Sequence, residues 1–264
     1  MKNIKFLVHF GLASFFIFIL TGCNQQKNND LWPIIDPLPL SIDIESQIDE
    51  MLPKLTLEQK VGQVIQGDSD SVTPEEVKEY RLGSVLSGGN SAPGPLPYAE
   101  TKNWLEMADK YYNASIDNEG VEIAIPIIWG IDAVHGHANL KGAIIFPHNI
   151  GLGAMNNPDL IEQIAGVTAH ELTISGHDWT FAPTLAVPRD LRWGRSYEGF
   201  SEDPDIVQSY GGRIVIGLQG KFGSDDFMSD GKVISSAKHF LADGATQNGA
   251  DPVSYTHLTL PTTD

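Results

Sequence analysis

The sequence is poor in cysteine, in basic residues and in long apolar runs. It contains 1 Cys in 264 residues, so no disulfide can form within the chain and no set of cysteines can bind zinc. It has 17 Lys and Arg but 34 Asp and Glu, which gives a net charge of −17. This charge would repel nucleic acid phosphates, which argues against nucleic acid as a partner. The apolar run from Phe6 to Leu20 includes His9 and is shorter than the roughly 20 residues that a membrane-spanning helix needs.

The composition that remains is typical of a globular domain with one sizeable core. Hydrophobic residues make up 41% of the chain, with 26 Gly and 16 Pro, which excludes disordered, collagen-like and coiled-coil classes. The total length is close to the roughly 250 residues of a (β/α)8 barrel.

The N-terminus predicts a bacterial lipoprotein. Lys2 and Lys5 precede the apolar run, and the sequence LTGC that ends at Cys23 resembles the lipoprotein processing box. We therefore expect a signal peptide over residues 1–22 and diacylation of the Cys23 thiol, with a polar tether over residues 23–45. Two acyl chains give stable anchoring, so the expected location is a bacterial membrane, facing the periplasm or on the outer membrane.

The C-terminal residues 252–264 predict a non-native tail. The segment VSYTHLTLPTT resembles one translated frame of a sequencing adapter, and we exclude it from the fold. Residues 46–251 then form the expected domain, which is shorter than the whole chain.

Between these ends, helical patterns alternate with short apolar runs, which is typical of an α/β domain with parallel strands. Thr56 can cap a helix with Gln59 reaching back. The helices are expected at Ser46–Leu52, at Thr56–Gln66 with Leu57, Val61, Val64 and Ile65 on one face, from Thr101, after Asn157 and after Asp203. The strands are expected at Leu82–Leu86, Ile125–Trp129, Ile144–Phe146, Trp179–Ala182 and Val233–Ala237.

Polar residues gather directly after these expected strands. Examples are Asp132 after one run, His148 after another and Lys238 with His239 after the last. A parallel α/β barrel carries its active site at the carboxyl ends of its strands. The pattern therefore predicts a site at that end.

Six segments match one family in order and spacing. The chain resembles the N-terminal domain of family 3 glycoside hydrolases, the β-glucosidase and glucan exohydrolase group. The matching segments are LTLEQKVGQ from Leu55, GSVLSGG from Gly83, IPIIWGIDAVHG from Ile125, FPHNIGLGA from Phe146, FAPTLAVPRDLRWGRSYEGFSEDP from Phe181 and AKHFLADG from Ala237. The resemblance implies an α/β fold that is an incomplete (β/α)8 TIM-like barrel.

The resemblance also implies sugar-binding roles for four residues. Asp132 matches the sugar-binding aspartate, and a carboxylate there can accept hydrogen bonds from two adjacent hydroxyls. Arg195 matches the arginine of the Trp-Gly-Arg motif, and Lys238 and His239 match the Lys-His pair of donors. Arg189 and Arg192 are expected to form structural ion pairs instead, with the acids Asp190, Glu198 and Glu202.

No catalytic residue can be assigned within the chain. A retaining glycosidase needs two carboxyl groups about 5 to 5.5 Å apart. The family's nucleophile lies on a later strand and its acid/base in a following domain, both beyond Asp251. We therefore expect the full-length parent to remove terminal β-D-glucosyl residues from β-glucosides or β-glucan oligosaccharides, and this fragment to be inactive and insoluble or molten when expressed alone.

Three alternatives remain open at this stage. A lipid-anchored module could bind sugar without cleaving it. A β-N-acetylhexosaminidase of the same family would carry a histidine in the loop from Leu241 to Asp251, which has none. His135 and His137 could open a binuclear metal site with His148, His170 and Asp178. The family pattern requires His135 but not His137, so we expect no metal and no cofactor.

Overall fold

The computed structural model describes residues 40–89, 91–239, 242–246 and 248–250. The chain divides into two units, Met1–Ile48 and Asp49–Asp264, and the sheet, the candidate site and the groove discussed below lie in the second. The predicted signal peptide, Cys23 and the predicted tail at 252–264 fall outside the described residues. In the part of the chain that is described, no helix is both long and apolar enough to cross a membrane.

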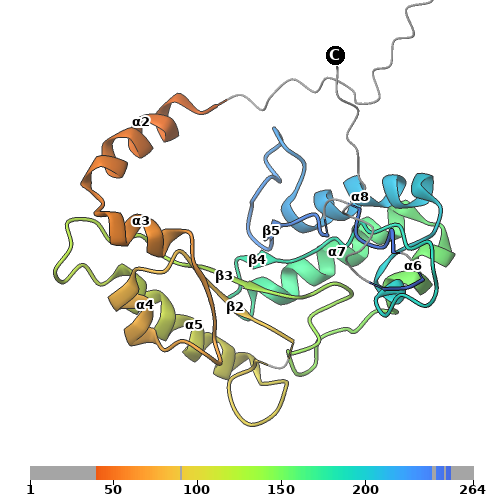
Figure 1. The fold of residues 1–264 in the computed structure, drawn as a ribbon, viewed down its shortest axis with the longest axis horizontal. Helices are drawn as coiled ribbons and strands as arrows, with labels where there is room; N and C mark the ends of the chain where they lie inside the picture. Colours follow the sequence, from red (N-terminus) through yellow and green to blue (C-terminus); the bar gives the residue numbers. More distant parts are fainter. Residues whose placement is uncertain (1–39, 90, 240–241, 247, 251–264) are drawn as a thin grey trace, which may run out of the picture. The chain divides into compact units, whose positions relative to one another are not determined.

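Helices and strands alternate along the chain, as the sequence predicts (Figure 1). In chain order the elements are α2 (Ile42–Met51), η1 (Leu52–Lys54), α3 (Leu57–Gln63), β1 (Gln66–Asp68), α4 (Pro74–Tyr80), β2 (Ser84–Ser87), α5 (Thr101–Ile116), β3 (Ile128–Ile131), α6 (Asn149–Met155), α7 (Pro158–Thr173), β4 (Trp179–Thr180), η2 (Ser196–Glu198), α8 (Pro204–Gln219) and β5 (Ile234–Ser235).

The strands form one parallel sheet in the order β1-β2-β3-β4-β5. Each strand pairs with its neighbour in sequence, for example Val85 with Trp129 and Thr180 with Ser235. In Figure 1, α4 and α5 lie near β2, whereas α7 and α8 lie near β4 and β5. Strands that add in sequence order through helical crossovers are wound as in a (β/α)8 barrel.

The helix caps follow the sequence closely. The Thr56 side chain accepts a hydrogen bond from the Gln59 amide while the Gln59 side chain bonds the Thr56 amide, which is the predicted capping box. Asn157 caps α7 and Asp203 caps α8, both as predicted. These short-range bonds explain why the helix starts were predictable.

The core lies between the sheet and its helices. The predicted face of α5 is confirmed, since Trp104 and Tyr111 are buried and Met107 and Ala108 pack against the core. The helices α7 and α8 also contact each other, and their buried side chains include Ile161, Leu172, Tyr210 and Leu218.

Two expectations about elements are wrong. Residues 144–146 form no strand, because β3 pairs directly with β4 through Gly130 and Trp179 and leaves no position between them. The helix expected to reach Gln66 ends at Gln63, and Gln66 instead begins β1, a strand the sequence did not suggest. The structure also adds α4, which Thr73 caps.

The expected apolar face of α3 is not buried. Leu57 is 72% exposed and Val64 84% exposed, and Val61 and Ile65 are exposed too. The buried residues of α3 are Gln59 and Gly62. α3 packs inward through Gly62, whose backbone lies against the Tyr80 and Arg81 carbonyl oxygens, so the side of the helix that carries the apolar residues points away from the core.

Candidate active site

Asp132 and Lys238 meet at the carboxyl ends of two strands. Asp132 follows β3 and Lys238 follows β5, and the Lys238 Nζ donates a hydrogen bond to the Asp132 Oδ1. The side chain of Asp132 is 43% exposed, whereas that of Lys238 is 18% exposed. The carboxylate therefore has one ion-paired oxygen and an accessible side on which a ligand hydroxyl could bind.

Arg195 is held by a bidentate pair with Glu198. The Arg195 Nε and Nη2 each lie 2.7 Å from one oxygen of the Glu198 carboxylate. Both residues belong to the loop after β4, where η2 brings positions three apart together. Burial alone would raise the pKa of Glu198, but the hydrogen bonds and charge of Arg195, with Lys238 and His239, outweigh it and lower that pKa.

Arg195 also contacts His239. The Arg195 Nη2 lies 2.8 Å from the His239 Nε2, and the His239 Nδ1 lies 3.7 Å from the Asp243 Oδ2. Burial, followed by the charges of Arg195 and Lys238, lowers the pKa of His239 against the opposing effect of Asp243 and Glu198. The structure thus brings all four sequence-predicted residues into one cluster, with Glu198 and Asp243 beside them.

Three aromatic side chains stack in the loops that follow the strands. The rings of His135 and His148 lie 3.9 Å apart, and Tyr197 meets His148 edge-on at 4.4 Å. The His135 Nδ1 lies 2.8 Å from the Phe146 carbonyl oxygen. Burial and the neighbouring His135 lower the pKa of His148, although Glu198 opposes them.

Of the histidines of the alternative metal site, His135 and His148 lie ring to ring, but His137 does not join them. His137 is buried and its Nε2 lies 3.0 Å from the Ser175 Oγ, whereas His135 contacts the Phe146 carbonyl. Over the described residues, no three His, Cys, Asp or Glu side chains lie close enough to hold a metal ion.

Sequence reasoning assigned the loop arginines correctly in part. Arg192 pairs with Asp190, as expected of a structural ion pair. Glu198 pairs with Arg195 rather than with Arg189 or Arg192. The spacing of three residues between Arg195 and Glu198 is the sequence feature that could have predicted this pair. It predicts a contact only where the loop forms a helical turn, as it does at η2.

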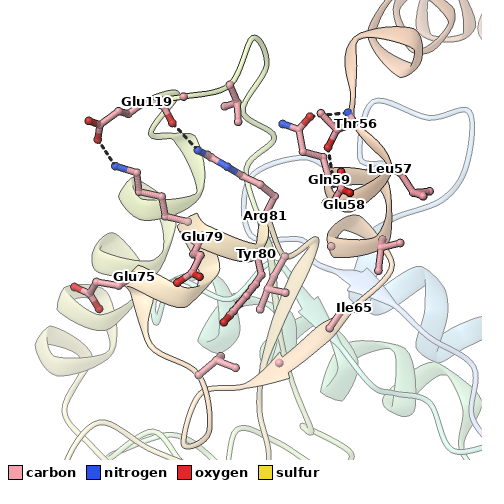
Figure 2. Close-up of a pocket in the computed structure, with 18 residues that line it drawn as sticks. Thr56, Leu57, Glu58, Gln59, Ile65, Glu75, Glu79, Tyr80, Arg81 and Glu119 are labelled. Atoms are coloured by element: carbon pink, nitrogen blue, oxygen red, sulfur yellow. Dashed lines mark hydrogen bonds and ion pairs between the residues drawn. The ribbon is translucent and has the colours of Figure 1, made fainter.

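A separate groove lies away from this cluster, and Figure 2 shows it in close-up. It has a volume of about 1080 Å³ and is lined by α3, by α4 and by residues 119–121, with Ile65 and Leu82 just before β1 and β2. It therefore lies at the amino ends of the strands. Because barrel chemistry belongs to the carboxyl ends, the groove is not the candidate site.

Comparison with known proteins decides the family. The sequence model described as the N-terminal domain of glycosyl hydrolase family 3 matches residues 56–260, which include every residue of the cluster. The chain belongs to glycosyl hydrolase family 3.

Similar family 3 proteins carry glycosidase names. The chain is 32% identical to the lysosomal beta glucosidase of Dictyostelium discoideum over 77% of this chain and 26% of that protein. It is 36% identical to the periplasmic beta-glucosidase of Salmonella typhimurium over 49% of this chain and 16% of that protein. The chain thus spans about a quarter or less of these relatives.

A solved family 3 structure supports the fold. The exo-1,3/1,4-beta-glucanase ExoP of a Pseudoalteromonas species matches with 48% identity and a TM-score of 0.78, covering 83% of this chain and 27% of that one. With the sequential parallel sheet, this match confirms the predicted fold: an α/β domain that forms part of a TIM-like barrel.

Proposed function

We propose that the extended protein, meaning this chain continued through its natural reading frame beyond Asp251, is a retaining glycoside hydrolase that removes terminal β-D-glucosyl residues from β-glucosides or β-glucan oligosaccharides. The observation that carries the proposal is the meeting of Asp132, Arg195, Lys238 and His239 at the carboxyl ends of the strands. The names of the family relatives support the same chemistry.

The donors and acceptors of the cluster suit a neutral sugar. The Asp132 carboxylate can accept from two neighbouring hydroxyls, and the Lys238 ammonium and Arg195 guanidinium can donate to others. Ion pairs within the cluster balance most of its charge, so it presents hydrogen-bonding groups without a strong net field. An uncharged substrate needs no electrostatic steering, which agrees with the acidic net charge of the chain.

The covalent step requires groups outside this cluster. Its carboxylates are already engaged, Asp132 by Lys238 and Glu198 by Arg195. We assign the nucleophile to an aspartate that follows a later strand and the acid/base to a following domain. The nucleophile would form a glycosyl ester as the aglycone departs with a proton from the acid, and water would then release the sugar.

The test is turnover by the extended protein. It should release the chromophore from an aryl β-glucoside, and the sugar first formed should be the β anomer by proton NMR. The reading frame beyond Asp251 should contain an aspartate at the end of a later strand. If that aspartate is missing, or if the α anomer forms first, the proposed mechanism is wrong.

The alternatives give different results in the same assay. A binding module would bind glucose without turnover. A β-N-acetylhexosaminidase would prefer the aryl N-acetyl-β-glucosaminide, and the absence of histidine from residues 241–251 favours the glucoside.

We also propose that Cys23 anchors the protein to a bacterial membrane through two acyl chains. The support is the LTGC sequence at the end of the N-terminal apolar run. In a bacterial host, the wild type should sediment with membranes and Cys23→Ala should not. Equal distribution of the two proteins would contradict the anchor.

A further inference from the structure

Arg195 has N–H donors that remain available for a ligand after two of its N–H groups have bonded Glu198. An arginine has five N–H groups: one on Nε and two on each terminal nitrogen. In the described structure, the Nε group and one Nη2 group bond Glu198, and the second Nη2 group faces His239. The two groups on Nη1 bond none of the described residues. The Arg195 side chain is 41% exposed, so these groups are accessible to a ligand.

Glu198 is the fixed member of the pair. Its side chain is 10% exposed, and its carbonyl oxygen accepts a 2.8 Å hydrogen bond from the buried Asn149 side chain of α6. Ser196, at the start of η2, bonds the Asp190 and Trp193 carbonyl oxygens. Hydrogen bonds to its backbone and within its loop therefore hold Glu198 in place. The orientation of the more exposed Arg195 side chain is then set by its two hydrogen bonds to Glu198.

The same contact determines the protonation of His239. Arginine can only donate, so the His239 Nε2 must accept from the Arg195 Nη2 and must lack a proton. The proton of a neutral His239 then lies on Nδ1, which faces Asp243. Asp243 and Glu198 thus lie at opposite ends of a line of four side chains.

We propose that Glu198 is a positioning residue of the sugar site: it holds Arg195 so that the Nη1 groups face the sugar, and through Arg195 it fixes His239 as the Nδ1-protonated tautomer. The sugar-binding part of this inference depends on the proposed function. The tautomer part does not, because it follows from the contacts of the unliganded site.

The test compares Glu198→Gln, Glu198→Asp and Asp190→Asn in the extended protein. Glutamine keeps the shape of Glu198 but cannot accept two hydrogen bonds from Arg195. Misplacement of a binding group costs about 10- to 100-fold, so kcat/KM on the aryl β-glucoside should fall by that factor, mainly through a higher KM. Glu198→Asp keeps the charge and should recover part of the loss.

Asp190→Asn is the matched control. It breaks another bidentate arginine–carboxylate pair of the same loop, that of Arg192, away from the cluster. It should leave KM unchanged. A structural role for Glu198 would lower the melting temperature and the folded fraction but not alter KM. An unchanged KM in Glu198→Gln, or an equal rise in Asp190→Asn, would overturn the positioning role.

Nitrogen NMR of ¹⁵N-histidine-labelled protein tests the tautomer independently of turnover. His239, assigned with a His239→Asn variant, should show an unprotonated Nε2 in the wild type and a mixture of tautomers in Glu198→Gln. If the wild type shows a protonated Nε2, the inference is wrong even when turnover is normal. If turnover and glucose binding are both absent, the proposed function fails while the NMR result still decides the role of Glu198.

Discussion

The Lys238 ammonium and the Asp132 carboxylate neutralise each other in the unliganded site. A sugar that bonds both must therefore replace or share a charge-assisted contact, which favours hydroxyl pairs that can bridge the two groups. The contact also keeps Lys238 directed toward the end of β3. At the scale of single residues, the site is a set of paired ions that a polar ligand can enter.

Replacing the Asp132 carboxylate tests whether it accepts hydrogen bonds from the sugar. Asp132→Asn should lower kcat/KM on the aryl β-glucoside by about 100-fold or more, because two charge-assisted hydrogen bonds to hydroxyls are weakened and Lys238 loses its partner. Steady-state kinetics of the extended protein measures the loss. Glu202→Gln, which changes an exposed acid on the loop after η2, should behave as the wild type. Wild-type activity in Asp132→Asn would show that Asp132 does not belong to the proposed sugar site.

At the scale of elements, α7 and α8 are joined where glycine lets their backbones approach. A Cβ on Gly217 of α8 would clash with the Glu162 carbonyl oxygen and would lie 2.6 Å from the Ala165 Cβ, both in α7. On the same helix, a Cβ on Gly212 would meet nothing within 4 Å. An alanine at Gly217 therefore tests how closely α7 and α8 pack, whereas an alanine at Gly212 tests only helix propensity.

Substituting each glycine with alanine should give opposite results. Gly217→Ala should destabilise the extended protein by about 2 kcal/mol or more, because overpacking pushes α7 and α8 apart. Gly212→Ala should be neutral or stabilise it by up to about 1 kcal/mol, since alanine has the better helix propensity. Urea unfolding measures both. Equal effects would mean that the helices are not packed as described.

Two buried histidines link β4 to the loop after β3. His137 and His177 both bond the Ser175 hydroxyl, and the rings contact Trp104. Burial lowers the pKa of His137 to about 4, and burial, then His137, lowers the pKa of His177 well below its usual value. Both side chains are therefore neutral in the fold.

The sign of the pH effect follows from these lowered values. A histidine whose folded pKa lies below the unfolded value of about 6.5 contributes full stability above pH 6.5 and loses it as the pH falls. His137 alone should then cost up to about 2 kcal/mol at pH 5. Urea midpoints of the extended protein at pH 7 and pH 5 test this. His170→Gln changes an exposed histidine of α7 and should leave the pH dependence of stability unchanged. Equal urea midpoints of the unmodified protein at pH 7 and pH 5 would contradict burial of the two neutral histidines.

At the scale of the whole molecule, the sheet has two edges without a partner in the described residues. There, β1 pairs with β2 and β5 pairs with β4, and neither strand has a second neighbour. The groove of Figure 2 lies beside β1 and exposes Leu57, Val61 and Tyr80. Unpaired edges and exposed apolar surface both favour association.

Residues 24–251 expressed alone should therefore be insoluble or molten and inactive. Calorimetry should show no cooperative transition, and near-ultraviolet circular dichroism should be weak, because neither edge of the described sheet has a strand to cover it. The extended protein is the control and should unfold cooperatively. A cooperative transition together with turnover by residues 24–251 would contradict this expectation.

The sequence alone determined the features that depend on neighbours in the chain. Thr56, Asn157 and Asp203 were predictable as caps because each bonds an amide two or three residues away. The family was predictable because its motifs are continuous segments. The polar residues after each apolar run predicted a cluster at the strand ends, and Asp132 and Lys238 do meet there.

Only the tertiary structure decided which groups meet and which faces are buried. Lys238 pairs with Asp132, which lies 106 residues earlier in the chain. Glu198 pairs with Arg195 rather than with another loop arginine because the turn of η2 brings the two side chains together. The apolar residues of α3 have the spacing of a core-facing helix in the sequence, yet they remain exposed in the structure. Burial and charge pairing depend on distances through space, and these are fixed only when the strands assemble.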